Sequence, residues 1–367
     1  MSKNFDILPL HHWVASGNET LIIAGPCSAE SEEQLLQTAI EIAKIPAVKI
    51  FRAGIWKPRT RPDGFEGVGE IGLEWLKQVK ETTGLLTTVE VATPHHIEAC
   101  LRNGIDVLWL GARTVGNPFS MQEIAEALKG IDIPIMIKNP LNPDLKLWLG
   151  AIERIHQVGI KKIAAIHRGF YTYNSQPYRN APLWEIPIEL KRILPDLPII
   201  SDPSHIAGNR ILLSSIAQKA MDLEMQGLMI EVHPHPEKAL TDAKQQITAE
   251  ALGKLLSELI FRKEKGSSEF EDKLYSLRSM IDSTDDELIQ ILAKRMDLVS
   301  QIGEYKKDNN ITILQIKRWN EIICKRLSKA KEFGLHSNFI KKLLEILHEE
   351  SIQIQTDILN KNKEEHK

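Results

Sequence analysis

Short apolar segments alternate with amphipathic segments along the first two thirds of the chain. Eight of them are rich in the branched aliphatic residues typical of buried strands, and stretches long enough for a helix separate them. The eight predicted strands are Leu21–Ala24, Val48–Phe51, Leu85–Val91, Val107–Leu110, Ile133–Ile137, Lys162–Ile166, Pro198–Ser201 and Gly227–Val232. Strands that alternate with helices predict a parallel sheet with crossover helices.

The number of these units indicates how the sheet closes. Eight strand and helix units over about 250 residues is the size of a TIM barrel. The alternative is an open, doubly wound sheet, which would carry a glycine-rich nucleotide loop after its first strand. The segment Gly25-Pro26-Cys27 does not have that pattern. We therefore expect a (β/α)8 TIM barrel.

The pattern changes after Phe261. Residues 264–269 are polar and aperiodic, which is typical of a linker between a barrel at 1–263 and a second domain at 270–367. In the second domain, apolar residues recur at helical spacing and predict three helices that end near Lys307, Glu332 and Asn360. The long first helix has an apolar stripe that one chain cannot cover. We expect an all-α three-helix domain that forms a homodimer.

Bulk composition excludes several classes of protein. The formal net charge of −3 gives no overall basic field, so we expect no nucleic-acid partner. No apolar run approaches the roughly 20 residues that a membrane helix needs, and Met1–Pro9 lacks the features of a secretory signal. The three cysteines, Cys27, Cys100 and Cys324, are odd in number and far apart. A reducing, cytoplasmic location is therefore expected.

Four potential metal ligands follow or end predicted strands. Cys27 closes the first apolar segment, Glu231 lies in the last, and Asp242 comes shortly after it. His205 follows the seventh strand, three residues before Gly208, which is expected to open a helix. Any one of these residues alone is more often structural. Together they form a mixed sulfur, nitrogen and oxygen set, which admits Mn²⁺, Fe²⁺, Co²⁺ or Zn²⁺ and excludes the all-oxygen sites of Mg²⁺ and Ca²⁺.

Basic residues occupy the same strand ends. Each could be an ordinary exposed side chain, but the carboxyl ends of all barrel strands surround one pocket. These residues are Arg52, Lys57, Arg59, Arg113, Lys138 and Arg168. Cations grouped around a metal site predict polyanionic substrates, since Arg and Lys bind phosphate and carboxylate oxygens.

Six motifs occur in a fixed order along the barrel segment. They are Gly25-Pro26-Cys27-Ser28, Lys57-Pro58-Arg59-Thr60, Gly111-Ala112-Arg113, Lys138, His167-Arg168-Gly169 and Ser201-Asp202-Pro203-Ser204-His205. This combination resembles 3-deoxy-D-arabino-heptulosonate 7-phosphate (DAHP) synthases of the short type I beta subfamily, over residues 5–262. The resemblance implies condensation of phosphoenolpyruvate with erythrose 4-phosphate, the entry step of the shikimate pathway. A sister family that makes 3-deoxy-manno-octulosonate 8-phosphate from arabinose 5-phosphate resembles Lys-Ala-Asn-Arg-Ser-Ser where this chain has Lys-Pro-Arg-Thr.

The resemblance also implies roles for individual residues. The metal ligands would be Cys27, His205, Glu231 and Asp242, with Mn²⁺ the preferred ion and Fe²⁺, Co²⁺ or Zn²⁺ the alternatives. The substrate-binding residues would be Arg52, Lys57 and Lys138 for the phosphoenolpyruvate carboxylate, Arg113 and Arg168 for its phosphate, and Arg59 and Thr60 for the sugar phosphate.

Two residues are candidates for the chemical steps. Lys57, between the two anions, would protonate the aldehyde oxygen of erythrose 4-phosphate as the new bond forms. Glu90, within a predicted strand, would orient the attacking water, and it could equally be a structural salt-bridge partner.

Polar residues of the helical segment resemble those of the all-helical chorismate mutases, which rearrange chorismate to prephenate. The matching residues over about 270–360 are Arg278, Arg295, Lys306, Arg318, Ser351 and Gln355, together with Asp285 and Gly303. Four cations suit the two carboxylates of chorismate, and a unimolecular rearrangement needs only that the compact conformer be held and the charge on the ether oxygen be stabilised. The resemblance implies that Lys306 and Gln355 contact that oxygen and that Arg278 reaches into the partner chain's site.

The helical segment departs from that family at two positions. Gln315 and Trp319 stand where the family commonly has Asp and Glu for the substrate hydroxyl, and an indole can only donate a hydrogen bond. A tail that only senses a ligand or mediates dimerisation is the alternative to a mutase. Because the chain enters its first strand at Leu21, we expect feedback by chorismate or prephenate to act through this tail.

Overall fold

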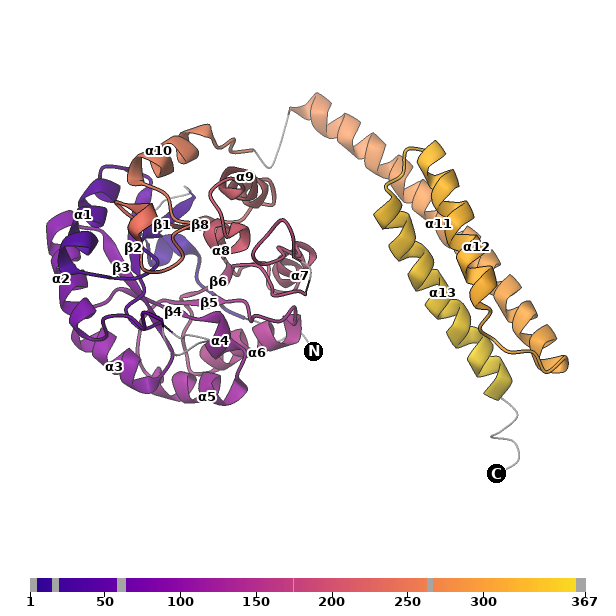
Figure 1. Ribbon diagram of the computed structural model, residues 1–367, viewed down its shortest axis with the longest axis horizontal. Helices are drawn as coiled ribbons and strands as arrows, with labels where there is room; N and C mark the ends of the chain where they lie inside the picture. The colour runs from indigo at the N-terminus through magenta and orange to yellow at the C-terminus, as the bar shows by residue number, and fades with distance from the viewer. Residues whose placement is uncertain (1–4, 15–19, 58–63, 174, 263–266, 361–367) are drawn as a thin grey trace. The chain divides into compact units, whose positions relative to one another are not determined.

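The chain forms two compact units, Met1–Arg262 and Lys263–Lys367, which are considered separately. The computed structural model describes residues 5–14, 20–57, 64–173, 175–262 and 267–360 (Figure 1). Within these residues, no helix combines the length and the apolar character needed to span a bilayer.

Eight parallel strands close into a barrel in sequence order. They are β1 (Leu21–Gly25), β2 (Val48–Ala53), β3 (Leu86–Val91), β4 (Val107–Leu110), β5 (Ile135–Lys138), β6 (Ile163–His167), β7 (Ile199–Ser201) and β8 (Gly227–Glu231). The predicted TIM barrel is confirmed, because β1 pairs with β8 from Leu21↔Gly227 to Gly25↔Glu231 and leaves no open edge. The expected strands differ from these only by one or two residues at their ends.

The longer helices of this unit cover the outside of the barrel, and the shorter helical segments lie at the ends of strands (Figure 1). The helices are α1 (Glu32–Ala43), α2 (Ile71–Thr83), α3 (Pro94–Arg102), α4 (Ala112–Val115), α5 (Pro118–Ala127), α6 (Leu145–Gln157), α7 (Glu185–Ile193), α8 (Pro203–Ala207), α9 (Leu213–Asp222) and α10 (Ala249–Glu258), with short 3-10 turns η1 (Leu10–His12) and η2 (Pro236–Lys238). Side-chain caps help to set where several begin. Ser31, Thr93 and Thr248 each accept a hydrogen bond from a backbone amide in the first turn of α1, α3 and α10.

The interior of the barrel is a packed apolar cluster. Ile23, Trp109 and Met229 are fully buried within it, and Leu10 and Val14 from the η1 region belong to the same cluster. Because these side chains fill the barrel, it is not a pore, and the polar residues are gathered at the carboxyl ends of the strands.

Three helices make up the second unit: α11 (Ser268–Asp308), α12 (Ile316–Glu332) and α13 (Ser337–Asn360). Their ends agree closely with the periodicity of the sequence. The predicted linker at 264–269 is too long at its C-terminal end, because Ser267 caps a helix that begins at Ser268. Residues 263–266 lie outside the described part of the chain. Helix α13 packs against both α11 and α12 (Figure 1).

Candidate functional site

Three acidic groups converge where β1 and β8 end. Cys27 follows β1, Glu231 is the last residue of β8, and Asp242 lies in the loop between β8 and α10. One ligand atom from each lies within 4.8 Å of those of the other two. The sulfur of Cys27 is 3.6 Å from Oδ2 of Asp242. Since β1 and β8 are neighbours in the closed barrel, the pairing that closes it also brings these residues together.

His205 brings an imidazole to the same place. Its Nε2 lies 3.7 Å from Oε1 of Glu231 and 4.0 Å from Oδ2 of Asp242. Its Nδ1 lies 2.7 Å from Oδ2 of the buried Asp202, which fixes the ring and leaves Nε2 directed at the cluster. The expectation that Gly208 opens a helix is wrong. Gly208 ends α8 with φ of 68°, a left-handed conformation that favours glycine.

The donor set suits a borderline divalent ion. A thiol, an imidazole and two carboxylates match the ligands of Mn²⁺, Fe²⁺, Co²⁺ or Zn²⁺. Oε1 of Glu231 is buried and has no hydrogen-bond partner among the described residues, although Nη2 of Arg52 lies 3.2 Å away. A buried oxygen in this state would gain a partner from a bound cation, so the residues fit the metal.

The pKa values of Cys27, His205 and Asp242 are shifted in different ways. Burial, together with the charge of Glu231, raises the pKa of the Cys27 thiol to about 12. Burial lowers the pKa of His205, which favours the neutral imidazole that binds metals. Burial opposes ionisation of Asp242, but His205 and Arg179 outweigh it and lower the pKa of that carboxyl to about 2. A metal would therefore have to displace a proton from Cys27, but not from His205 or Asp242.

A cavity of about 790 Å³ opens beside this cluster. Most of its polar lining is cationic or comes from the cluster itself. The lining residues are Lys57, Glu90, Ala112, Arg113, Lys138, Leu141, Arg168, Tyr171, Arg179, Asn180, His205 and Asp242. Its volume falls in the range of small-molecule sites, and its walls suit a polyanion.

The predicted basic residues reach this region from successive strands. Lys138 ends β5, Arg168 follows β6, and Arg113 lies in α4 after β4. Burial lowers the pKa of Arg168 to about 10, and Nη1 of this residue donates to Oδ1 of Asn180 at 2.8 Å. Burial also lowers the pKa of Lys138 despite Asp202, whose Oδ2 is 3.5 Å from its Nζ. Both cations are held in place before a substrate arrives.

Lys57 and Arg52 contact the candidate metal ligands Cys27 and Glu231 directly. Nζ of Lys57 is 2.8 Å from the carbonyl oxygen of Cys27 and 3.1 Å from its sulfur. Burial by itself lowers the pKa of Lys57, but the acidic groups of Cys27, Glu231 and Glu90 outweigh it and raise that pKa. Arg52 is buried behind Glu231 and is not one of the described residues that line the cavity.

Glu90 lies on β3 and faces the cavity. Its Oε2 accepts a hydrogen bond of 2.8 Å from Nε1 of Trp109, so it has a structural partner. Burial opposes its ionisation, but Lys138 and Lys57 outweigh burial and lower the pKa of this carboxyl. A side chain at Gly111 would place its Cβ 2.2 Å from Oε1 of Glu90, which explains glycine there.

Several lining residues have no role in the sequence analysis. Tyr171, Arg179 and Asn180 come from the long β6–α7 loop. Asp202, which is buried and contacts His205, belongs to the motif Ser201–His205 and has no predicted function of its own. The positions of residues on a loop of this length depend on non-local contacts, so strand-end reasoning does not identify them. Arg59 and Thr60, predicted to hold the sugar phosphate, lie outside the described residues.

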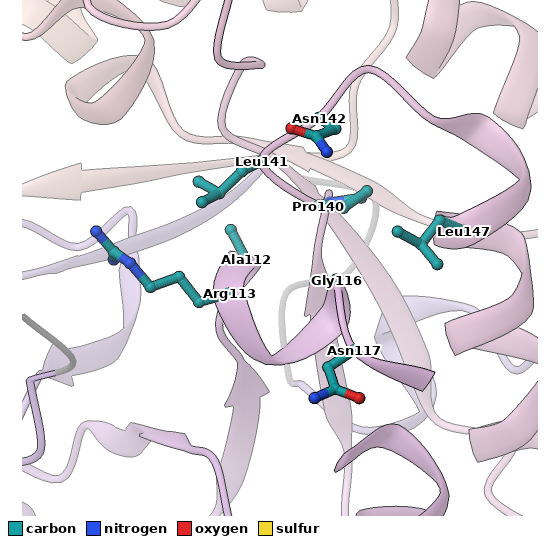
Figure 2. Close-up of a pocket in the computed structure, with 8 residues that line it drawn as sticks. All are labelled: Ala112, Arg113, Gly116, Asn117, Pro140, Leu141, Asn142 and Leu147. Atoms are coloured by element: carbon teal, nitrogen blue, oxygen red, sulfur yellow. The ribbon is translucent and has the colours of Figure 1, made fainter. Parts of the chain in front are cut away.

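A smaller cavity of about 240 Å³ adjoins α4. It is lined by Ala112, Arg113, Gly116, Asn117, Pro140, Leu141, Asn142 and Leu147, and it shares Ala112, Arg113 and Leu141 with the larger cavity (Figure 2). The guanidinium of Arg113 extends away from Gly116 and Asn117 (Figure 2). Arg113 thus lies between two neighbouring cavities.

The helical unit brings some of its predicted residues together. Nη1 of Arg295 on α11 donates to Oγ of Ser351 on α13 at 2.9 Å. Gly303 on α11 lets α13 approach, because a Cβ there would lie 3.2 Å from Cγ of Gln355. Nζ of Lys306 donates to the carbonyl oxygen of Ile313 at 2.6 Å.

Other predicted residues of this unit lie apart from that group. Arg278 and Gln315 are exposed, and Arg318 pairs with Glu321 at 3.0 Å. The indole of Trp319 stacks on the imidazole of His348 with the ring centroids 3.9 Å apart. Both rings line a cavity of about 350 Å³ between α12 and α13, which also includes Glu345, Glu349, Ile352 and Gln353.

Comparison with known protein families gives two matches. Residues 9–265 match the DAHP synthetase I family, and residues 277–356 match chorismate mutase type II. A phospho-2-dehydro-3-deoxyheptonate aldolase of Thermotoga maritima is 33% identical over 238 residues, which cover 65% of this chain and 68% of that protein. A 2-dehydro-3-deoxyphosphooctonate aldolase of Desulfatibacillum aliphaticivorans is 28% identical over 67% of this chain and 93% of its own length.

The C-terminal segment is similar to part of another protein, and the barrel is similar to a solved structure. A bifunctional chorismate mutase/prephenate dehydratase of Buchnera aphidicola subsp. Schizaphis graminum is 37% identical over 91 residues, which are 25% of this chain and 24% of that protein. Among solved structures, a DAHP synthase from Thermotoga maritima superposes with a TM-score of 0.59 at 31% identity, covering 66% of this chain and 68% of its own.

Proposed function

Because this chain belongs to the DAHP synthetase I family and also carries a chorismate mutase type II domain, we propose that it is a bifunctional shikimate-pathway enzyme. Its barrel condenses phosphoenolpyruvate with erythrose 4-phosphate to DAHP and inorganic phosphate. The observation that carries the proposal is the cationic cavity beside the four convergent metal ligands. The separated, unpaired cysteines are consistent with a cytoplasmic enzyme.

The cavity supplies cations for each anionic group of phosphoenolpyruvate. Arg113 and Arg168 bind its phosphate, since guanidinium groups match phosphate oxygens in pairs. Lys57 and Lys138 face its carboxylate, and Arg52 supports that end through Glu231. Arg59 and Thr60 hold the sugar phosphate, as the family motif implies.

Cys27, His205, Glu231 and Asp242 hold a divalent ion, with Mn²⁺ the preferred species. When bound there, such an ion would supply Lewis acidity toward the aldehyde of erythrose 4-phosphate. Asp202 keeps Nε2 of His205 available for this purpose by engaging Nδ1.

The residues of the chain assist two chemical steps. In the first, the π electrons of the phosphoenolpyruvate double bond form a bond from its methylene carbon to the aldehyde carbon, Lys57 donates a proton to the aldehyde oxygen, and the phosphate-bearing carbon becomes electron-deficient. The raised pKa of Lys57 keeps that proton available near neutral pH. In the second, the ionised Glu90 orients the water that attacks the phosphate-bearing carbon, after which the bond from that carbon to the phosphate oxygen breaks. Phosphoenolpyruvate, the sugar phosphate and water thus give DAHP and phosphate.

Phosphate release from phosphoenolpyruvate tests the synthase activity. We expect release with erythrose 4-phosphate, little with arabinose 5-phosphate, and none after a chelator removes the metal. Preference for arabinose 5-phosphate would instead support the octulosonate activity of the sister family.

The helical unit rearranges chorismate to prephenate in this proposal. Arg295, held by Ser351, and Arg318 bind the carboxylates, while Lys306 and Gln355 contact the ether oxygen. Trp319 forms an aromatic wall with His348 in place of a family carboxylate. Loss of chorismate followed by absorbance in the isolated residues 267–367 would separate a mutase from a tail that only senses a ligand.

A second copy of the chain completes the helical unit. Leu277, Ile281, Leu288, Ile291 and Ile302 of α11 are each about half exposed or more within one chain. A stripe of this size in water favours association, and a two-fold dimer covers it on both copies. Arg278, exposed on the same helix, would then reach the partner's site.

The tail also provides feedback in this proposal. Chorismate or prephenate bound to the helical unit shifts the chain toward an arrangement that hinders the synthase site. Prephenate should inhibit phosphate release by the full chain, and cleavage near Gly266 should abolish the inhibition. Inhibition that persists without residues 267–367 would place the effector site on the barrel.

A further inference from the structure

Gln245 connects two of the metal-binding carboxylates. It lies in the loop between β8 and α10 and is only 1% exposed. Its Nε2 donates to Oε2 of Glu231 at 2.7 Å and to Oδ2 of Asp242 at 3.3 Å. Its Oε1 accepts a hydrogen bond of 2.7 Å from Nη1 of Arg179. One buried amide thus contacts three charged side chains.

The chemistry of the amide explains why glutamine suits this position. Two carboxylates require hydrogen-bond donors and the guanidinium of Arg179 requires an acceptor, and an amide supplies both from one side chain. A glutamate would place a third negative charge beside Glu231 and Asp242, and an aliphatic residue would leave all three groups without this partner.

These contacts leave one oxygen of each carboxylate directed toward the cluster. Oε2 of Glu231 is held by Gln245, while Oε1 lies 3.2 Å from Nη2 of Arg52 and 3.7 Å from Nε2 of His205. Oδ1 of Asp242 is held by Arg179 at 2.9 Å, while Oδ2, which also accepts the longer hydrogen bond from Gln245, faces the sulfur of Cys27. Each carboxylate is therefore restrained by contacts from outside the cluster.

The backbone of the loop supports the same orientation. Asp242 has φ of 50°, a left-handed conformation that is uncommon outside glycine and is tolerated best by Asp and Asn. The backbone amide of Gln245 donates to the carbonyl oxygen of Asp242 at 3.1 Å, which closes the turn. Gln245 thus stabilises both the backbone and the side chain of this ligand.

We propose that Gln245 is a positioning residue that orients the carboxylates of Glu231 and Asp242 and thereby sets the affinity and geometry of the metal site. This inference rests on the proposed function, since it requires that the cluster bind a divalent ion. Hydrogen-bonding partners of metal ligands typically change metal affinity by about 10- to 100-fold when they are removed.

Cobalt binding to the full chain tests the role. Gln245→Met has a similar length but offers no strong hydrogen bond, so we expect it to bind Co²⁺ about 10- to 100-fold more weakly in competition with a chelator. Its visible and thiolate charge-transfer absorption should also change, because these bands report the geometry around the ion. Gln37→Met, at an exposed glutamine of α1, is the matched control and should behave as the unaltered chain.

The possible outcomes separate the two proposals. Unchanged Co²⁺ affinity and absorption in a folded Gln245→Met variant would overturn the positioning role, even if its melting temperature fell. Failure of the unaltered chain to bind Co²⁺ would overturn the metal site and this inference together. Should Gln245→Met fail to fold, Gln245→Asn carries the same test, because its shorter amide cannot reach both carboxylates.

Discussion

Nη2 of Arg52 lies 3.2 Å from Oε1 of Glu231, and both side chains are almost completely buried. The guanidinium also lies over the ring of Trp109, 5.1 Å from its centroid. The carboxylate proposed to bind the metal thus has a fixed counter-charge of its own. Breaking such a pair from one side leaves a buried charge uncompensated.

Arg52→Leu should therefore lower the free energy of unfolding of the metal-free chain by about 3 to 5 kcal/mol. Denaturant unfolding in the presence of a chelator measures this loss. Arg52→Lys, which keeps a positive charge, should cost less. A loss below about 1 kcal/mol for Arg52→Leu would contradict a stabilising role for this buried pair.

His205→Ala should abolish the synthase activity and leave the mutase activity intact. The variant removes the imidazole from the proposed metal ligands, which all belong to the barrel unit. Phosphate release and chorismate consumption measure the two activities on one preparation. His235→Ala, at an exposed histidine of the β8–α10 loop, is the control and should retain both. A His205→Ala variant with most of its metal-dependent rate would contradict the ligand assignment.

Arg295→Ala and Arg318→Ala should each reduce the mutase rate by orders of magnitude, because each leaves a carboxylate of chorismate without its cation. The synthase rate without effectors should scarcely change. Arg326→Ala, at an exposed arginine of α12, provides the comparison for general effects on the helix. Retained mutase activity in both Arg295→Ala and Arg318→Ala would favour a tail that only binds a ligand.

Leu288→Asp should convert the dimer expected for the full chain to a monomer. The residue is 48% exposed on α11, so a charge there costs little within one chain but opposes burial against a second copy. Sedimentation at several concentrations measures the change, and mutase activity should fall with it if Arg278 contributes to the partner's site as proposed. A full chain that is already monomeric would contradict the proposed dimer.

The stability of the barrel should decrease as the pH falls from about 6.5 to about 4. Burial lowers the pKa of His167 from 6.5 to about 4, so in this window the unfolded chain binds a proton that the folded chain excludes. Exclusion of this proton lowers the free energy of unfolding by about 3 kcal/mol at pH 4. The loss disappears above the pKa of histidine in the unfolded chain.

His167→Gln isolates that contribution. Glutamine can still donate to the carbonyl oxygen of Pro182, which accepts a hydrogen bond of 2.6 Å from Nε2 of His167, but it does not titrate. The variant should therefore lose less stability between pH 6.5 and 4 than the unaltered chain in thermal unfolding. Identical pH dependence in the two proteins would show that His167 binds a proton as readily in the folded chain as in the unfolded chain.

Local pattern determined the architecture of this protein. The alternation of short apolar runs with amphipathic segments predicted the barrel. Strands of a parallel sheet are buried on both faces, so each one appears in the sequence as a continuous apolar run. Closure then places the ends of β1 and β8 side by side, so Cys27 and Glu231 could be expected near one another from chain order alone. Helical periodicity likewise located the ends of α11, α12 and α13 to within about a residue.

Only the tertiary structure decided how the side chains of the site are oriented. Asp202 fixes the ring of His205, and Gln245 links Glu231 to Asp242 across the β8–α10 loop. Arg179 reaches Asp242 from a loop that follows a different strand. Strand ends are placed by hydrogen bonding along the sheet, which has a repeating geometry, whereas loop conformations depend on contacts between distant segments that no local periodicity encodes.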